Sequence, residues 1–161
     1  MKTKKPNRGA TAGMLSLASV LSSQVEIDQV RLVSTMARLG SPPQEGPVSI
    51  EFAYSVHSKA NVKEGLVLVH PIFKVKGEDR KGRLRTPVFE IEAAFLLIYK
   101  VKDFTAVTKR VLDAFGQSNG IYNAWPYWRE YVQSVVGRMC LPPLTAPVFR
   151  LEKPGSSSSR K

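Results

Sequence analysis

The sequence has very little cysteine, little histidine and no long apolar run. Of its 161 residues, one is cysteine and two are histidine, which excludes an intrachain disulfide and a multi-cysteine zinc site. A single thiol is typical of a reducing compartment, and we expect Cys140 to be a small interior residue rather than a nucleophile. No stretch approaches the roughly 18–20 apolar residues that a membrane-crossing helix needs, so we predict no membrane insertion.

The motifs of several enzyme classes are also absent. There is no glycine-rich phosphate loop, no paired-histidine metal motif and no nucleophile elbow. His57 and His70 fall on different predicted strands, and a metal site usually takes three or four ligands. Glu90 and Glu92 share a strand face, where solvated or cation-paired carboxylates are the common case. Nothing here favours an enzyme, and we predict no catalytic residue, metal or cofactor.

Acidic residues are scarce compared with basic ones. The chain has 24 Lys and Arg against 13 Asp and Glu, a formal net charge of +11. The excess is concentrated in residues 1–10, 74–85 and 150–161, while the rest of the chain is neutral. Such tails and loops can bind polyanions non-specifically, but they lack a stacking platform and a helix-turn-helix or zinc-finger spacing. A basic nucleic-acid-binding module therefore remains one alternative function, second to those given at the end of this section. No specific nucleic-acid partner is expected.

The length suits one domain with a sizeable core. Residues 1–23 are predicted to form a basic, flexible N-terminal arm, and residues 150–161 a flexible basic serine-rich tail. The apolar stretch at 13–21 is interrupted by serines and no small-x-small cleavage site follows it, so we predict no signal peptide and a cytoplasmic location. Residues 24–149 are the predicted folded domain.

The middle of the chain has the period-2 alternation of strands. Over residues 24–38 the apolar pattern slips by one position after Ile27, which predicts a bulge. Residues 40–47 contain three prolines and two glycines and predict an irregular crossover. Strands follow over 48–57, 66–76 and 88–101, with a polar hairpin connection over 77–82. Pro71 lies within the third strand and predicts an edge or bulged position.

The spacing of apolar residues then becomes helical. A short helix is predicted over 104–115 with Gly116 as its stop, followed by a turn at Asn119-Gly120. A longer helix follows, with Asn123 as its N-cap and Pro126 in its first turn. Strands followed by helices predict an α+β fold. We expect a four-stranded antiparallel sheet with a proline-rich crossover, followed by a short and a long helix packed on one face.

The long helix and the segment after it contain three distinctive motifs. Residues 126–130 are Pro-Tyr-Trp-Arg-Glu, residues 141–144 are Leu-Pro-Pro-Leu and residues 146–148 are Ala-Pro-Val. This order resembles the SecB family of protein-export chaperones, which has a proline-tyrosine-x-arginine-glutamate helix start, a paired proline and an alanine-proline-valine run. The resemblance is specific over 115–149 and extends further through the same order of elements. It implies a SecB-like fold and a cytosolic holdase that works without nucleotide as a dimer or a dimer of dimers.

The resemblance also implies two surfaces. The long helix would form the oligomer interface, through Trp125, Trp128, Tyr131, Val132, Val135 and Met139. The client-binding groove would be bordered by the crossover after Leu39, the second strand and the segment near 144–149, through Val48, Ile50, Phe52, Tyr54, Leu144, Val148 and Phe149. Such a groove binds extended chains by apolar area and backbone pairing, which tolerates many client sequences.

Two differences from the family leave the client open. The family continues past the alanine-proline-valine run into a helix that lids the groove, whereas residues 150–155 are short and contain Pro154. Typical export members are acidic and meet the translocation motor SecA, whereas this chain is basic. The expectation is an ATP-independent holdase for unfolded or extended polypeptides in protein export or transport, with SecA as a candidate partner. The alternative is a dedicated SecB-like chaperone of an antitoxin in a toxin–antitoxin system.

Overall fold

The computed structural model describes residues 8–42, 48–81 and 84–149, and for residues 8–11 and 80–81 the backbone alone. Its elements are α1 (Arg8–Ser22), β1 (Val25–Leu39), β2 (Val48–Asn61), β3 (Leu66–Lys81), β4 (Leu84–Val101), α2 (Lys109–Phe115) and α3 (Ile121–Arg138). A 3₁₀ turn (Val62–Glu64) joins β2 to β3, and a π-helical turn (Gly116–Gly120) joins α2 to α3. The predicted tail over 150–161 and most of the crossover lie outside the described residues.

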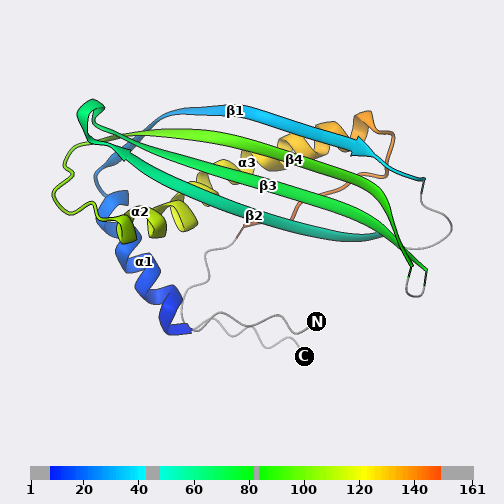
Figure 1. The fold of residues 1–161 in the computed structure, drawn as a ribbon, viewed down its shortest axis with the longest axis horizontal. Helices are drawn as coiled ribbons and strands as arrows, with labels where there is room; N and C mark the ends of the chain where they lie inside the picture. The colour runs from blue at the N-terminus through cyan, green and yellow to red at the C-terminus, as the bar shows by residue number, and fades with distance from the viewer. Residues whose placement is uncertain (1–7, 43–47, 82–83, 150–161) are drawn as a thin grey trace.

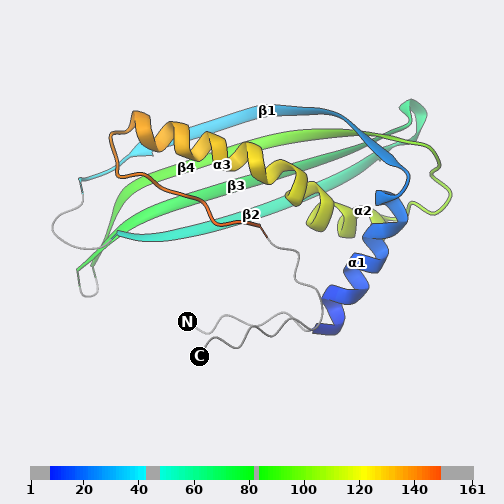
Figure 2. The same ribbon diagram turned by 180° about the vertical axis from the view of Figure 1, so that it is seen from behind.

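The four strands form one antiparallel sheet in the order β1-β4-β3-β2. Figure 1 and Figure 2 show α2 and α3 on one face of this sheet, which we call the helix face; no described helix covers the other, the open face. The predicted α+β architecture is confirmed. None of the described helices is long and apolar enough to cross a membrane.

The pairing of β1 with β4 is interrupted twice. One register shift lies between Ile27 and Gln29 and the other between Leu32 and Ser34. The first is where the apolar pattern slips in the sequence, so the predicted bulge is confirmed. Because a one-residue slip would otherwise turn every following side chain to the other face, the first shift keeps Val30 and Leu32 on the helix face with Ile27. After the second shift Met36 pairs with Glu92 on the open face.

The prediction that the third strand is an edge strand, or is bulged at Pro71, is wrong; its register shift with β4 lies between Gly77 and Glu78. β3 lies between β4 and β2, and Pro71 is buried near its middle. The pairing with β4 passes from Val69↔Leu97 to Ile72↔Ala94 without a change of register, so the interruption at Pro71 is local. A residue of an antiparallel strand directs its N–H towards one neighbour only, and the ladder with β4 omits His70 and Pro71 and then resumes at Ile72. β3 also continues through residues 77–81, which were predicted as a connection.

The predictions of a helix stop at Gly116 and of a turn at Asn119-Gly120 are also wrong. Gly116 has right-handed helical dihedrals, and the backbone continues through the π-helical turn into α3. A Cβ on Gly116 would collide with the Ser58 hydroxyl, and a Cβ on Gly120 would lie 2.5 Å from Val69 Cγ1. These glycines therefore let the helical turn approach β2 and β3 closely.

Asn123, predicted as an N-cap, lies inside α3, because the helical backbone continues from the π-helical turn into α3. Its Nδ2 donates a hydrogen bond to Tyr99 Oη at 3.0 Å. Burial raises the pKa of Tyr99 to about 12, although the hydrogen bond from Asn123 acts in the opposite direction. The pair anchors the beginning of α3 to β4.

The predicted flexible arm contains a helix, so that expectation is wrong for residues 8–22. In α1, Ala18 and Leu21 are buried and Leu17 packs partly against the core. Their three- and four-residue spacing puts them on one side, although serines between them obscure the pattern in the sequence. α1 and α2 border an open hollow of about 540 Å³ lined by Gly13, Met14, Leu17, Arg110, Asp113, Ala114 and Gln117.

Candidate functional site

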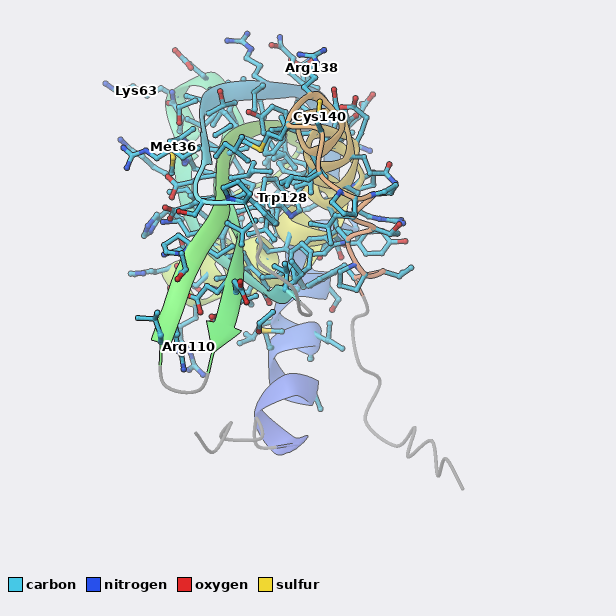
Figure 3. The ribbon with its side chains drawn as sticks, turned by 90° about the vertical axis from the view of Figure 1, so that its right-hand side faces the viewer. Met36, Lys63, Arg110, Trp128, Arg138 and Cys140 are labelled. Atoms are coloured by element: carbon cyan, nitrogen blue, oxygen red, sulfur yellow. The ribbon has the colours of Figure 1, made fainter. Side chains whose placement is uncertain are left out.

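The centre of the helix face is an aromatic cluster that positions α3. Phe73 of β3 stacks on Trp128, with ring centroids 5.5 Å apart and an interplanar angle of 16°. The Trp125 ring meets the same phenylalanine nearly edge-on at 5.6 Å. Trp128 is 0% exposed, and Figure 3 shows it between the sheet and α3. α3 is thus fixed by large rings whose burial and ring geometry both stabilise the packing.

Beside α3, the edge strand β2 leaves apolar side chains exposed on the helix face. Tyr54 pairs in register with Phe73 and is 46% exposed; Ile50 pairs with Gly77 and is 36% exposed. Val48 and Phe52 point to the same face and are partly buried against the core. We call Ile50, Tyr54 and Trp125 the β2 strip. It lies next to a strand edge that no other described strand pairs with.

The C-terminal segment (residues 141–149) returns across the helix face from the end of α3 towards β2 (Figure 2). Trp125 Nε1 donates a 2.8 Å hydrogen bond to the backbone oxygen of Pro147. The Phe149 ring lies 5.4 Å from the Trp125 ring and 6.0 Å from the Tyr54 ring. The segment therefore covers part of the β2 strip.

A small apolar cavity lies where α3 ends and the C-terminal segment begins. Its volume is about 280 Å³, and it is lined by Leu39, Gly40, Pro42, Met139, Cys140, Leu141 and Pro142. Cys140 has φ 54°, a left-handed conformation that ends α3 while the N–H of Leu141 bonds back to the carbonyl of Val136. The thiol residue is exposed, so the prediction that Cys140 is an interior residue is wrong.

The predicted client residues are thus brought to one face of the sheet. Tyr54 and Phe149 are in ring contact, and Leu144 is half-buried against the core. Val148 is the exception, because it is 64% exposed and is not part of this packing. Sequence reasoning missed the bond from Trp125 to Pro147, since any backbone carbonyl can accept an indole N–H.

The predicted oligomer-interface residues divide into two groups. Trp125, Trp128 and Val132 are buried against the chain's own sheet, so in this conformation they form the intrachain core. Tyr131, Val135 and Met139 are partly buried and keep exposed surface. Tyr131 is six positions from Trp125, about 120° around the helix, and so lies on the flank of α3 opposite the β2 strip.

A second exposed apolar strip follows β1. Ile27, Leu32 and Leu39 point to the helix face through their pairing with β4, and each is more than two-fifths exposed. We call these three residues the β1 strip. Nothing in the sequence alone distinguished them from core residues, because their alternation is the same as that of a covered strand.

Two basic residues of the segment 74–85, Lys74 and Lys76, are paired with carboxylates. Lys74 Nζ lies 2.8 Å from Glu92 and 3.4 Å from Glu90, and Lys76 Nζ lies 3.3 Å from Glu90. The hydrogen bond from Lys74 to Glu92 raises the pKa of that lysine. Partial burial would raise the pKa of Glu90, but Lys76 and Lys74 outweigh it and hold that pKa below its usual value. The open face therefore carries a ladder of neutralised charges.

The described residues hold no arrangement suited to catalysis by a metal. His57 and His70 are direct cross-strand partners of β2 and β3. However, within residues 8–42, 48–81 and 84–149 no three or more His, Cys, Asp or Glu side chains gather in a way that could hold an ion.

No family model matches the chain. It is similar to two curated proteins, the SecB-like chaperones Rv1957 and MT2006 from two strains of Mycobacterium tuberculosis. Each is 24% identical over 155 residues, which covers 87% of this chain and 86% of the relative. The resemblance to SecB-like chaperones thus extends over most of the chain, and these relatives are chaperones rather than enzymes.

A solved structure has the same fold. It is that of the Mycobacterium tuberculosis Rv1957 SecB-like chaperone in complex with a ChAD peptide from the Rv1956 HigA1 antitoxin. The two structures align with a TM-score of 0.75 and 20% sequence identity, covering 84% of this chain and 97% of the other. The fold of this chain is therefore SecB-like.

Proposed function

We propose that this chain is a chaperone that holds unfolded or extended polypeptides without nucleotide. The observation that carries the proposal is that Ile50 and Tyr54 of the β2 strip are exposed beside an edge of β2 with which no described strand pairs. An extended client can add hydrogen bonds to this edge while its apolar side chains contact Tyr54 and its neighbours. The similarity to SecB-like chaperones supports this use of the surface.

Such a surface suits reversible binding. Burying ~1,000 Å² of apolar area at about 25 cal/mol per Å² gives roughly 25 kcal/mol of gross stabilisation. The ordering of a disordered client and its lost translational freedom cancel most of that gain. The remaining affinity is modest, so a client is held and later released without an energy source.

Two client classes fit this activity, a range of export substrates delivered to SecA and a single antitoxin. We favour the antitoxin class for this chain. The solved SecB-like relative is in complex with an antitoxin peptide, and the net charge of +11 differs from the acidic character of export members. In either role the proposed place of action is the cytoplasm.

We also propose that the β1 strip and the adjacent flank of α3 form the contact between subunits. Tyr131 and Val135 keep exposed surface on the flank of α3 opposite the β2 strip, and Leu32 is 51% exposed on β1. β1 is an edge strand, so pairing with a second copy would satisfy its free backbone groups. This assembly, a dimer or a dimer of dimers, leaves the β2 strip free for clients.

The test of the proposed function is suppression of aggregation without ATP. A urea-denatured client is diluted with one subunit of the chain per client molecule, and light scattering is followed. We expect scattering to fall strongly with the wild type and less with Tyr54→Asp, which puts a charge on the β2 strip. Scattering unchanged by the wild type would contradict the proposal. A dedicated antitoxin chaperone would bind one antitoxin peptide at least a hundredfold more tightly than unrelated unfolded chains, whereas a general holdase would bind them similarly.

A further inference from the structure

We infer that the C-terminal segment is a displaceable ligand of the chain's own client site, so that a client binds by taking its place. This inference rests on the proposed function and identifies what occupies the β2 strip before a client arrives. It also indicates the client chemistry that fits the strip, because the segment is itself an extended polypeptide.

The segment contacts the strip through two residues. Pro147 accepts the hydrogen bond from Trp125 Nε1, and the Phe149 ring contacts both Tyr54 and Trp125. Ala146, just before them, is 1% exposed. A client that presents a carbonyl acceptor and, two residues later, an aromatic ring in extended form can make the same contacts.

Leu141 and Leu144 pack partly against the core, but the other residues of the segment are held weakly. Pro142, Pro143, Thr145 and Val148 are exposed. Among the described residues, 142–149 make no backbone–backbone hydrogen bond with the sheet or with α3. Prolines at 142, 143 and 147 have no N–H to donate. Release of the segment therefore breaks few specific contacts, in contrast to the start of α3, where glycines allow close packing on the strands.

A client can improve on the segment at the edge of β2. That edge has free backbone groups in the described part of the chain, and the proline-rich segment does not pair with it. A client without prolines can make the apolar contacts and also add a strand to the edge. The client and the C-terminal segment compete for the same site. The apparent association constant of the client is therefore its intrinsic value multiplied by the fraction of sites that the segment leaves unoccupied. In the absence of a client the segment reduces the exposure of Tyr54 and Trp125, which limits self-association.

The test weakens the segment at its aromatic anchor in the full-length chain. Phe149→Ala and Phe149→Leu are compared with Val148→Ala, the neighbouring control whose side chain is exposed. The probe is reduced and carboxymethylated α-lactalbumin, which stays unfolded, and binding is measured by calorimetry. We expect Phe149→Ala to bind about tenfold more tightly than the wild type, Phe149→Leu to lie between them, and Val148→Ala to match the wild type.

The outcomes separate this inference from the proposed function. If the wild type binds the probe and Phe149→Ala binds it equally or less tightly, the segment is part of the client site and the inference is overturned while the proposed function stands. If no variant binds, both fail. Thermal unfolding of each variant identifies any loss of fold, and Phe149→Leu, the milder change, then carries the comparison.

Discussion

Two glycines in the helical part of the chain provide a matched test of how α3 packs. Gly120 lies against β3, where a Cβ would be 2.5 Å from Val69 Cγ1, whereas a Cβ on Gly137 would meet nothing within 4 Å. Both positions are helical, so alanine gains about 1 kcal/mol of intrinsic helix propensity at each. At Gly137 this gain stands alone, and we expect Gly137→Ala to stabilise the fold by about 0.5–1 kcal/mol.

At Gly120 the new methyl group has to displace a buried neighbour. Val69 is 0% exposed and its branched side chain is stiff in a strand, so it cannot simply turn away. Overpacking of a core typically costs about 1–3 kcal/mol, from which the propensity gain of about 1 kcal/mol is subtracted. We expect Gly120→Ala to destabilise the fold by up to about 2 kcal/mol and to lower the melting temperature by up to roughly 8 °C.

The assay is urea unfolding followed by circular dichroism, with every variant at the same protein concentration because subunit association contributes to stability. The result that would refute the reasoning is a stabilising Gly120→Ala. It would mean that the helical turn does not approach β3 closely and that Gly120 acts only through local flexibility.

Three further outcomes follow from the described contacts. Burial holds the pKa of Tyr99 in the folded protein at about 12, against an ordinary value of 10. The contribution of the neutral Tyr99 side chain to the free energy of unfolding is therefore complete below pH 10. As the pH rises from 10 towards 12, about 2–3 kcal/mol is lost, and Tyr99→Phe should remove this decline from unfolding curves recorded between pH 9 and 12. The double variant Glu90→Gln/Glu92→Gln leaves Lys74 without its ionic partners, so it should leave a heparin column at higher salt than the wild type; equal elution would argue that the ladder does not mask the charge. Tyr131→Asp should shift the mass measured by light scattering towards a smaller species, whereas Tyr122→Asp, a tyrosine of the same helix that is 55% exposed, should not; an unchanged mass for Tyr131→Asp would count against the subunit contact.

The fold could be predicted where the signals were local. Strand alternation, the bulge after Ile27 and the change to helical spacing all appear in the sequence and in the structure. Predictions failed where tertiary contacts override a local rule. Gly116 and Gly120 allow close approach to the sheet and do not form a helix stop or a turn, and Pro71 is tolerated in an inner strand because the ladder with β4 is interrupted only locally.

The candidate site was predicted less completely. The alternation of β2 places Ile50 and Tyr54 on one face, and the structure brings Tyr54 into contact with Phe149. The stripe that contains Trp128 and Val132 shows which side of α3 is apolar, but not whether its own sheet or a partner covers that side. The structure shows that its own sheet covers them. A helical stripe has the same pattern in both cases, so only the three-dimensional packing distinguishes them.

The central claim is that clients bind at the exposed apolar surface beside β2. The most direct measurement is the dissociation constant of a permanently unfolded protein without nucleotide, for the wild type, Tyr54→Asp and the control Tyr122→Asp. The account predicts that Tyr54→Asp weakens binding at least tenfold while Tyr122→Asp leaves it unchanged, because Tyr54 belongs to the β2 strip and Tyr122, which is also exposed, does not. Equal binding by all three proteins, or none by the wild type, would contradict it.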